Sequence, residues 1–181
     1  MKITETKLKG CFILEPKIHV DDRGLFFESY HKTSLEQAIG ESINFVQDNI
    51  SVSKKGVLRG LHFQTGKHAQ TKLVQVLKGE VLDVVVDLRE QSSTFGQHFI
   101  LKLSSENKKS IFIPKGMAHG FLARTEDVIF TYKCDSHYHK DAESGIKYND
   151  PDLAIDWETN GINLILSPKD LRLPLWKELQ L

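Results

Sequence analysis

Closely spaced strand signals through the middle of the chain constrain its fold more than any other feature. Short segments rich in β-branched and aromatic residues follow one another, separated only by Gly, Asn or Ser turns. We expect strands at residues 72–77, 80–88, 98–103, 110–113 and 128–133. Strands joined by short turns are typical of a sandwich or barrel rather than of βαβ units, so the sequence predicts an all-β fold.

Residues 72–89 show the pattern most clearly. Lys78-Gly79 lies between two apolar runs and predicts a hairpin turn. In the second strand of that hairpin the residues alternate, with Val81, Asp83, Val85 and Asp87 on one face and Leu82, Val84, Val86 and Leu88 on the other. Two unlike faces are therefore expected for this strand.

Helix signals are few and lie near the two ends of the chain. One helix is predicted at residues 33–39, where Thr33 with Glu36, or Ser34 with Gln37, can form a capping box. Gly40 can supply its C-terminal stop. Ser167-Pro168 is typical of a helix N-cap followed by proline at the first helical position, and a short helix is expected to continue over residues 171–179. The predicted architecture is all-β with peripheral helices.

Composition excludes several classes of protein. The chain has 181 residues, with 24 Lys and Arg against 24 Asp and Glu, so its net charge gives no indication of nucleic-acid or membrane binding. Cys11 and Cys134 stand far apart without a metal-binding spacing and are interpreted as buried thiols. No apolar run approaches the ~20 residues of a membrane span. We expect one domain over residues 1–181, in a cytoplasmic protein.

The segment RGLHFQTGKHAQTKLVQV holds the densest group of functional residue types. His62 lies between Leu61 and Phe63 on an expected strand, so its side chain points to the opposite face from theirs and can face a barrel interior. Lys72 begins a strand that is expected to be interior. Inward lysines are rare unless they are paired or functional, so the two residues together indicate a site.

The segment IFIPKGMAHGF has the spacing PxGxxH after an apolar strand, which resembles the second motif of the cupin superfamily. In that motif the histidine, here His119, often binds a metal. The partner motif usually adds an HxH pair and a glutamate, whereas this chain has His62-Phe63-Gln64. One imidazole does not supply the three or four ligands that a transition metal requires, so no metal is expected.

Further polar residues are of interest only if they converge. Gln47, Asn49 and Arg59 suit phosphate or hydroxyl recognition, although either amide alone is more typical of a polar loop residue beside a strand. Arg23 sits beside a turn glycine and, alone, is a solvated charge. Tyr132 lies on an expected strand, where a tyrosine more often belongs to a core or an interface than to a catalytic site.

Taken together, these segments closely resemble the dTDP-4-dehydrorhamnose 3,5-epimerase (RmlC) family. The likeness runs in order from about residue 10 to about residue 174. It rests on the segments DDRGLFFESY, FVQDNISVSKKGVLRGLHFQ, QTKLVQVLKGEVLDVVVDLR, STFG, IPKGMAHGF, TYKC with a following Tyr and Glu, and SPKD. The resemblance implies a cupin-like jelly-roll β-barrel that works as a homodimer without metal or another cofactor, since the substrate's own ketone serves as electron sink.

The resemblance also implies residue roles. The base falls on His62, its carboxylate partner on Asp170, the lysine that stabilises an enolate on Lys72 and the proton donor on Tyr132. Positions that contact the dTDP-sugar fall on Arg23, Glu28, Gln47, Asn49, Arg59, His119, Glu143 and Lys169. The aromatic ring that packs against the nucleotide base falls on Tyr138. Members of the family commonly exchange the N-terminal strand between subunits, so Arg23 and Glu28 are expected to serve the neighbouring site.

The implied reaction inverts C3 and C5 of a nucleoside-diphosphate 4-keto-6-deoxyhexose in dTDP-rhamnose or polysaccharide biosynthesis. Three alternatives stay open: an epimerase of C3 only or C5 only, a ketoisomerase, and a non-catalytic cupin sugar-binding domain. The last is disfavoured because a binding protein needs no proton relay. The loop Thr65-Gly66-Lys67-His68 lacks the family's usual prolines, and Thr71 replaces a frequent glycine, so nucleotide preference and the number of inverted centres stay open.

Overall fold

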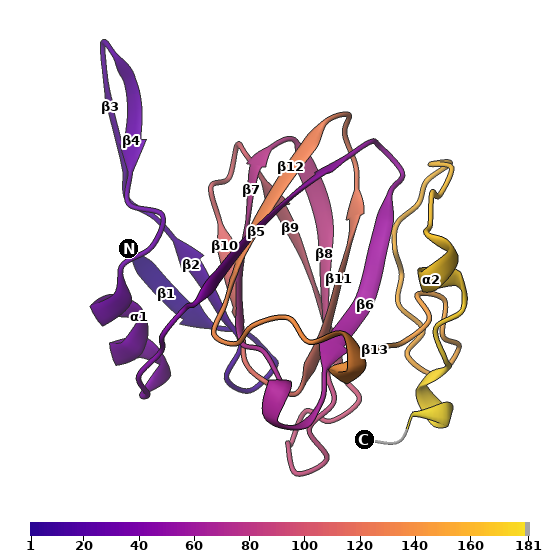
Figure 1. Ribbon diagram of the computed structural model, residues 1–181. Helices are drawn as coiled ribbons and strands as arrows, with labels where there is room; N and C mark the ends of the chain where they lie inside the picture. Colours follow the sequence, from indigo (N-terminus) through magenta and orange to yellow (C-terminus); the bar gives the residue numbers. More distant parts are fainter. Residues whose placement is uncertain (180–181) are drawn as a thin grey trace.

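The computed structural model describes residues 1–179, which form two antiparallel sheets packed face to face (Figure 1). The six-stranded sheet has the order β1 (Lys2–Glu5), β2 (Phe12–Glu15), β10 (Ser110–Ile113), β7 (Lys72–Lys78), β12 (Val128–Cys134), β5 (Gln47–Ser53). The five-stranded sheet has the order β13 (Glu143–Gly145), β6 (Leu58–Gln64), β11 (Met117–Ala123), β8 (Glu80–Asp87), β9 (His98–Ser104). All five predicted strands are confirmed to within a residue.

The remaining elements lie outside the two sheets. A separate hairpin, β3 (Ile18–Asp21) with β4 (Gly24–Phe27), extends away from the barrel in Figure 1. The helices are α1 (Lys32–Ile39) and α2 (Pro168–Leu171), and the 3₁₀ turns are η1 (Gly66–His68), η2 (Lys140–Ala142) and η3 (Trp176–Glu178). The prediction of short peripheral helices is confirmed. No helix within residues 1–179 is long and apolar enough to cross a membrane.

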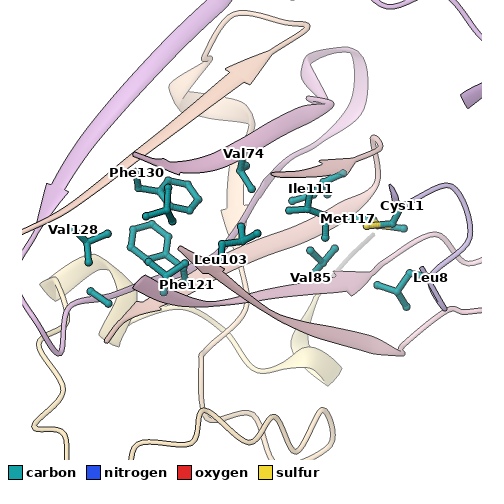
Figure 2. Packing of buried hydrophobic residues seen from close by; sticks show 14 residues of the cluster. Leu8, Cys11, Val74, Val85, Leu103, Ile111, Met117, Phe121, Val128 and Phe130 are labelled. Carbon is teal, nitrogen blue, oxygen red and sulfur yellow. The ribbon is translucent and has the colours of Figure 1, made fainter. Parts of the chain in front are cut away.

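Apolar residues from both sheets fill the space between them. Val74 on β7, Val85 on β8, and Phe121 and Phe130 on β11 and β12 meet there, as Figure 2 shows. The phenyl rings of Phe121 and Phe130 stack with centroids 4.3 Å apart. Cys11 lies in the same core, and both cysteines are buried free thiols, as predicted. Burial of this apolar surface holds the two sheets together.

The outer face of each sheet is also covered. Leu82, Val84 and Val86 of β8 pack against a cluster from the C-terminal segment that includes Leu153 and Trp157. The prediction that β8 has two unlike faces is confirmed, because its other face looks into the barrel. Residues of α1 cover the six-stranded sheet in the same way. The C-terminal segment thereby brings α2 to the side of β6.

The predicted hairpin at Lys78-Gly79 is wrong. β7 pairs with β10 and β12, whereas β8 pairs with β11 and β9, so the turn carries the chain from one sheet to the other. Gly79 has φ +81°, and a Cβ there would lie 2.4 Å from Thr125 Oγ1. A glycine turn between two apolar strands can join two paired strands of one sheet or carry the chain from one sheet to the other. Packing across the core determines which of the two forms.

Two details of the helices also differ from prediction. The N-cap of α1 is His31, whose Nδ1 accepts the Ser34 N–H at 3.2 Å, and no Ser/Thr capping box forms. Gly40 is the C-cap as predicted, with φ 77°. At the other end Ser167 caps α2 as predicted, but the helix stops at Leu171. Pro174 explains the stop, because proline disfavours helical geometry at the residue before it and donates no hydrogen bond.

Candidate active site

Two cavities that share lining residues lie between the sheets and form the two lobes of one site. The lobes have volumes of about 290 and 300 Å³, and His62, Lys72 and Tyr132 line both. The first lobe adds Gln47, Asn49, Phe63, Gln64, Gln70, Cys134, Tyr138 and Glu143. The second adds Ser51, Arg59, His119, Gly120, Phe121, Phe130, Ser167, Lys169 and Asp170. The structure therefore brings eleven of the thirteen expected site residues to one cavity.

Strand register explains how the three shared residues meet. Lys72 on β7 lies opposite Cys134 on β12, and Tyr132 comes two residues before Cys134. Since side chains two apart on a strand share a face, Lys72 and Tyr132 both point inward from the six-stranded sheet. His62 on β6 lies opposite His119 on β11 in the other sheet. The two sheets thus present their polar residues to the same space.

A close approach of two glycines shapes the backbone beside His62. A Cβ on Gly60, where φ is +126°, would lie 2.5 Å from the Cα of Gly120. The pairing of β6 with β11 shifts register between His119 and Phe121, at this same point. The glycine of the RGLH segment is therefore required for the strand contact that places His62 and His119 side by side.

His62 forms a pair with Asp170 of α2. The distance from His62 Nε2 to Asp170 Oδ1 is 2.5 Å, and Ser167 Oγ donates to the other carboxylate oxygen at 2.7 Å. Burial by itself would raise the pKa of Asp170, but the hydrogen bonds from His62 and Ser167 outweigh it and hold that pKa below its ordinary value. Asp170 is therefore ionised at neutral pH. A carboxylate only accepts, so Nε2 carries the proton and Nδ1 keeps a free lone pair.

Burial perturbs Lys72 and Tyr132 in opposite directions. It lowers the pKa of the Lys72 ammonium and raises the pKa of the Tyr132 phenol, because in each case the charged form is poorly solvated. Tyr132 is accordingly a neutral O–H donor at physiological pH. Cys134, which lines the same lobe, has its pKa raised to about 11 by burial and is an uncharged thiol.

The segment after β12 presents Tyr138 and Glu143 to the first lobe. The Tyr138 hydroxyl donates to Glu143 Oε2 at 2.7 Å, and Lys169 forms an ion pair with the same carboxylate. Gln47 Oε1 accepts the Tyr138 backbone N–H at 2.9 Å. Gln47 also donates to Asn49 Oδ1 at 2.9 Å. All five residues are therefore connected, because Tyr138 binds Glu143 through its hydroxyl and Gln47 through its backbone.

Sequence reasoning missed two residues that organise this site. Gln64 donates from Nε2 to the His68 carbonyl at 2.9 Å and accepts the His139 N–H at 2.6 Å, which ties the segment carrying Tyr138 to β6. Asp83 on β8 accepts from His119 Nε2 at 2.8 Å. An aspartate within a run of valines was a visible signal for the second residue, whereas Gln64 belongs to the densest group of functional residue types in the sequence but was given no role.

Arg23 and Glu28 lie outside the cavity. Arg23 sits in the turn of the β3–β4 hairpin, exposed, with its guanidinium 2.5 Å from Asp21 Oδ2. Glu28 follows β4 and is also exposed. Within one chain the hairpin extends away from the barrel (Figure 1), so neither residue contributes to the cavity of its own chain.

Residues suitable for a metal do not converge in the part of the chain that the structure describes. No group of three or more His, Cys, Asp or Glu side chains has a metal-binding arrangement within residues 1–179. His119 instead directs one ring nitrogen to Asp83. Activity without metal stays a prediction, to be tested by chelation.

Comparison with known proteins gives one consistent result. Residues 5–178 match the family model described as dTDP-4-dehydrorhamnose 3,5-epimerase. A curated Escherichia coli K12 protein of that name is 48% identical over 174 residues, covering 96% of this chain and 93% of the relative.

Solved structures agree with the family match. The dTDP-4-dehydrorhamnose 3,5-epimerase of Elizabethkingia anophelis has a TM-score of 0.95 and 50% identity, over 98% of this chain and 97% of that chain. A Legionella pneumophila dTDP-6-deoxy-D-glucose-3,5-epimerase, solved in complex with dTDP-4-keto-L-rhamnose, has a TM-score of 0.93 and 47% identity, over 99% of this chain and 94% of that chain. The likeness confirms the predicted cupin-like jelly roll.

Proposed function

This chain belongs to the dTDP-4-dehydrorhamnose 3,5-epimerase family, and from that premise we propose how its cavity carries out the reaction. The protein is an epimerase of a nucleoside-diphosphate 4-keto-6-deoxyhexose. It converts dTDP-4-dehydro-6-deoxy-D-glucose to dTDP-4-dehydro-L-rhamnose by inversion at C3 and C5, in dTDP-rhamnose biosynthesis. We assign residues 1–181 to a single cupin-like domain. The residue roles below are our proposal.

The substrate determines what the protein has to supply. A ketone at C4 acidifies the hydrogens on C3 and C5, because the carbanion left after deprotonation is delocalised as an enolate. The electron sink is therefore part of the sugar. The protein needs a base on one face, a positive donor at the enolate oxygen and an acid on the opposite face.

The pair His62–Asp170 is the observation that carries the proposal. Asp170 holds one proton on Nε2 of His62, which leaves the Nδ1 lone pair free to remove a proton from C3 or C5. Asp170 then stabilises the imidazolium that forms. A neutral imidazole is a competent general base at neutral pH. A sugar-binding domain has no need of such a pair.

Lys72 and Tyr132 supply the other two roles. The Lys72 ammonium stabilises the enolate oxygen as charge develops, which in a dry pocket contributes ~3 to 4 kcal/mol by analogy with oxyanion-hole donors. Tyr132 returns a proton to the opposite face of the carbanion. Burial raises its pKa, which keeps the phenol protonated until it is needed.

The remaining cavity residues bind the nucleotide part of the substrate. Arg59 and Lys169 supply donors for the diphosphate in the second lobe, where His119 presents its other ring nitrogen to the sugar. Tyr138 offers an exposed ring on which the thymine base stacks. Gln47, Asn49 and Glu143 supply the hydrogen-bonding groups of the first lobe.

The protein works as a homodimer in which the β3–β4 hairpin crosses to the neighbouring subunit. Support comes from the hairpin itself, where the side chains of Val20 and Phe26 are 76% and 72% exposed. The edge strand β5 is exposed as well, at Ile50 and Val52. Apolar surface of this kind is typical of an interface, and the exchange would deliver Arg23 and Glu28 to the partner's cavity.

We place the enzyme in the cytoplasm, where nucleotide sugars are made.

One experiment tests both the reaction and its alternatives. The protein is incubated with dTDP-4-keto-6-deoxyglucose in deuterated water, and NMR follows deuterium at C3 and C5 together with the configuration of the product. Deuterium at both centres and an L-rhamno product are expected. Exchange at one centre would identify a C3-only or C5-only epimerase, a 3-keto product a ketoisomerase, and binding without exchange a sugar-binding domain. Exhaustive chelation should leave turnover unchanged.

A further inference from the structure

Asp83 is a buried carboxylate that folding does not explain. It lies in the middle of β8 with no exposed surface, on the face that looks into the apolar core between the sheets. Its Oδ2 accepts from His119 Nε2 at 2.8 Å, and its Oδ1 has no hydrogen-bond partner. Burying an incompletely paired carboxylate costs several kcal/mol, so such groups are retained where they serve a function.

Asp87 shows what a structural aspartate on the same strand looks like. It lies four residues further along β8 and is equally buried. Its carboxylate accepts from Arg89 Nε at 2.8 Å, from Ser92 Oγ at 2.6 Å and from Thr94 Oγ1 at 2.6 Å. Both of its oxygens accept hydrogen bonds from neighbours that have no contact with the cavity. In Asp83, by contrast, one carboxylate oxygen accepts no hydrogen bond.

Two polar side chains of the cavity are coupled to Asp83. His119 donates to it directly, and the negative charge of Asp83 acts to raise the pKa of Lys72. Burial lowers the pKa of Lys72, while Cys134, Glu143 and Asp83 oppose that effect. Cys134 is an uncharged thiol at neutral pH, and Glu143 is already paired with Lys169. Asp83 is the carboxylate left to act on these donors.

We propose that Asp83 is a positioning residue of the active site, whose buried charge orients His119 and supports the protonated form of Lys72. This inference rests on the proposed function. It gives the cavity two histidine–carboxylate pairs with different tasks. Asp170 acts on the base that removes the proton, whereas Asp83 acts on the groups that hold the anionic substrate and its enolate.

The account predicts a pH dependence with a definite sign. Lys72 must keep its proton to stabilise the enolate, and removing the negative charge of Asp83 lowers its pKa further. The alkaline limb of kcat/KM then moves to lower pH. Cys11, the titratable group beside Asp83 in the core, has its pKa raised to about 12 by burial and stays neutral. The other titratable groups facing the cavity are His62, Arg59, Tyr132, Cys134, Tyr138, Glu143, Lys169 and Asp170.

The test compares Asp83→Asn with the matched control Asp87→Asn. Asparagine keeps the size of aspartate and an acceptor for His119 but removes the charge. For Asp83→Asn we expect kcat/KM to fall ~10- to 100-fold, by analogy with partners behind metal-binding histidines, and the alkaline limb to move to lower pH. The melting temperature should equal or exceed that of the wild type, because a poorly paired charge is gone. Asp87→Asn should lower the melting temperature and leave the pH profile of kcat/KM unchanged.

A merely structural role for Asp83 gives a different result. In that case Asp83→Asn lowers the melting temperature, and the alkaline limb stays in place, which would overturn the proposal. If the variant does not fold, ¹³C NMR of the wild type decides: the Asp83 side-chain carboxyl must give the signal of an ionised group at neutral pH, and a protonated Asp83 refutes the idea. Failure of the proposed function is distinguishable, since the wild type would then not convert the substrate.

Discussion

The cavity and the β3–β4 hairpin each contain an aspartate paired with a basic side chain at the same distance. His62 and Asp170 are 2.5 Å apart, and so are Arg23 and Asp21. The side chains of the first pair are 28% and 6% exposed, those of the second 90% and 54%. The cavity pair is held by surrounding structure and fixes a tautomer, whereas water competes for the hairpin pair and leaves Arg23 free to change partners. Burial, not distance, decides what each pair can do.

Neutralising the aspartate of each pair should give the largest contrast. Asp170→Asn leaves the imidazole in place but no longer fixes the proton on Nε2, so kcat should fall ~10²- to 10⁴-fold. Asp21→Asn, the matched change in the exposed pair, should leave kcat within about twofold. Steady-state kinetics of both variants measure the contrast. Equal losses would mean that burial does not distinguish the pairs.

Arg23→Ala sharpens the comparison by testing what the exposed residue is for. If Arg23 leaves Asp21 to meet substrate phosphate in the partner's site, its loss should raise KM ~10-fold and change kcat little, because a charge-assisted bond to bound substrate is removed. Lys17→Ala, another exposed cation near the hairpin, serves as control and should change neither constant. A wild-type KM for Arg23→Ala would place this arginine outside the site.

Val20→Glu tests the apolar surface of the hairpin. A charge there opposes burial against a second copy, so light scattering should show a shift from twice the 20.6 kDa chain mass toward the monomer. Phe95→Glu, at an exposed phenylalanine in the loop between β8 and β9, should stay dimeric. A Val20→Glu protein that remains a dimer with full activity contradicts the exchanged hairpin.

Asp87→Asn extends the comparison to stability. Burial would raise the pKa of Asp87, but hydrogen bonds from Arg89, Ser92 and Thr94 outweigh it and lower that pKa to about 2. Because the pKa of Asp87 is lower in the folded state, its ionisation stabilises the fold at pH values above the unfolded-state pKa of about 3.9. This contribution is lost as pH falls from ~4 to ~2. At pH 7 the variant should lose roughly 1 to 3 kcal/mol in denaturant unfolding, with little difference from wild type at pH 2. The same loss at both pH values would rule out ionisation as the cause.

The sequence predicted the strands and the inward direction of His62 and Lys72 because both follow from local alternation. It failed at Lys78-Gly79, since a glycine turn is compatible with a hairpin or with a corner, and only packing across the core distinguishes them. The Thr33 or Ser34 cap gave way to His31, an acceptor that residue preferences do not favour. Asp83 went unassigned because its partner lies 36 residues away, on a strand whose pairing with β8 is not a local property.

The assignment of His62 as base and Tyr132 as acid on opposite faces of the sugar is the central claim, and solvent exchange tests it most directly. His62→Asn and Tyr132→Phe are each incubated with dTDP-4-keto-6-deoxyglucose in deuterated water, and NMR follows C3 and C5. His62→Asn should show neither exchange nor product, because no carbanion forms. Tyr132→Phe should retain exchange while epimerised product falls ~10²- to 10⁴-fold. Wild-type exchange by His62→Asn would contradict the account, because another group would then be the base.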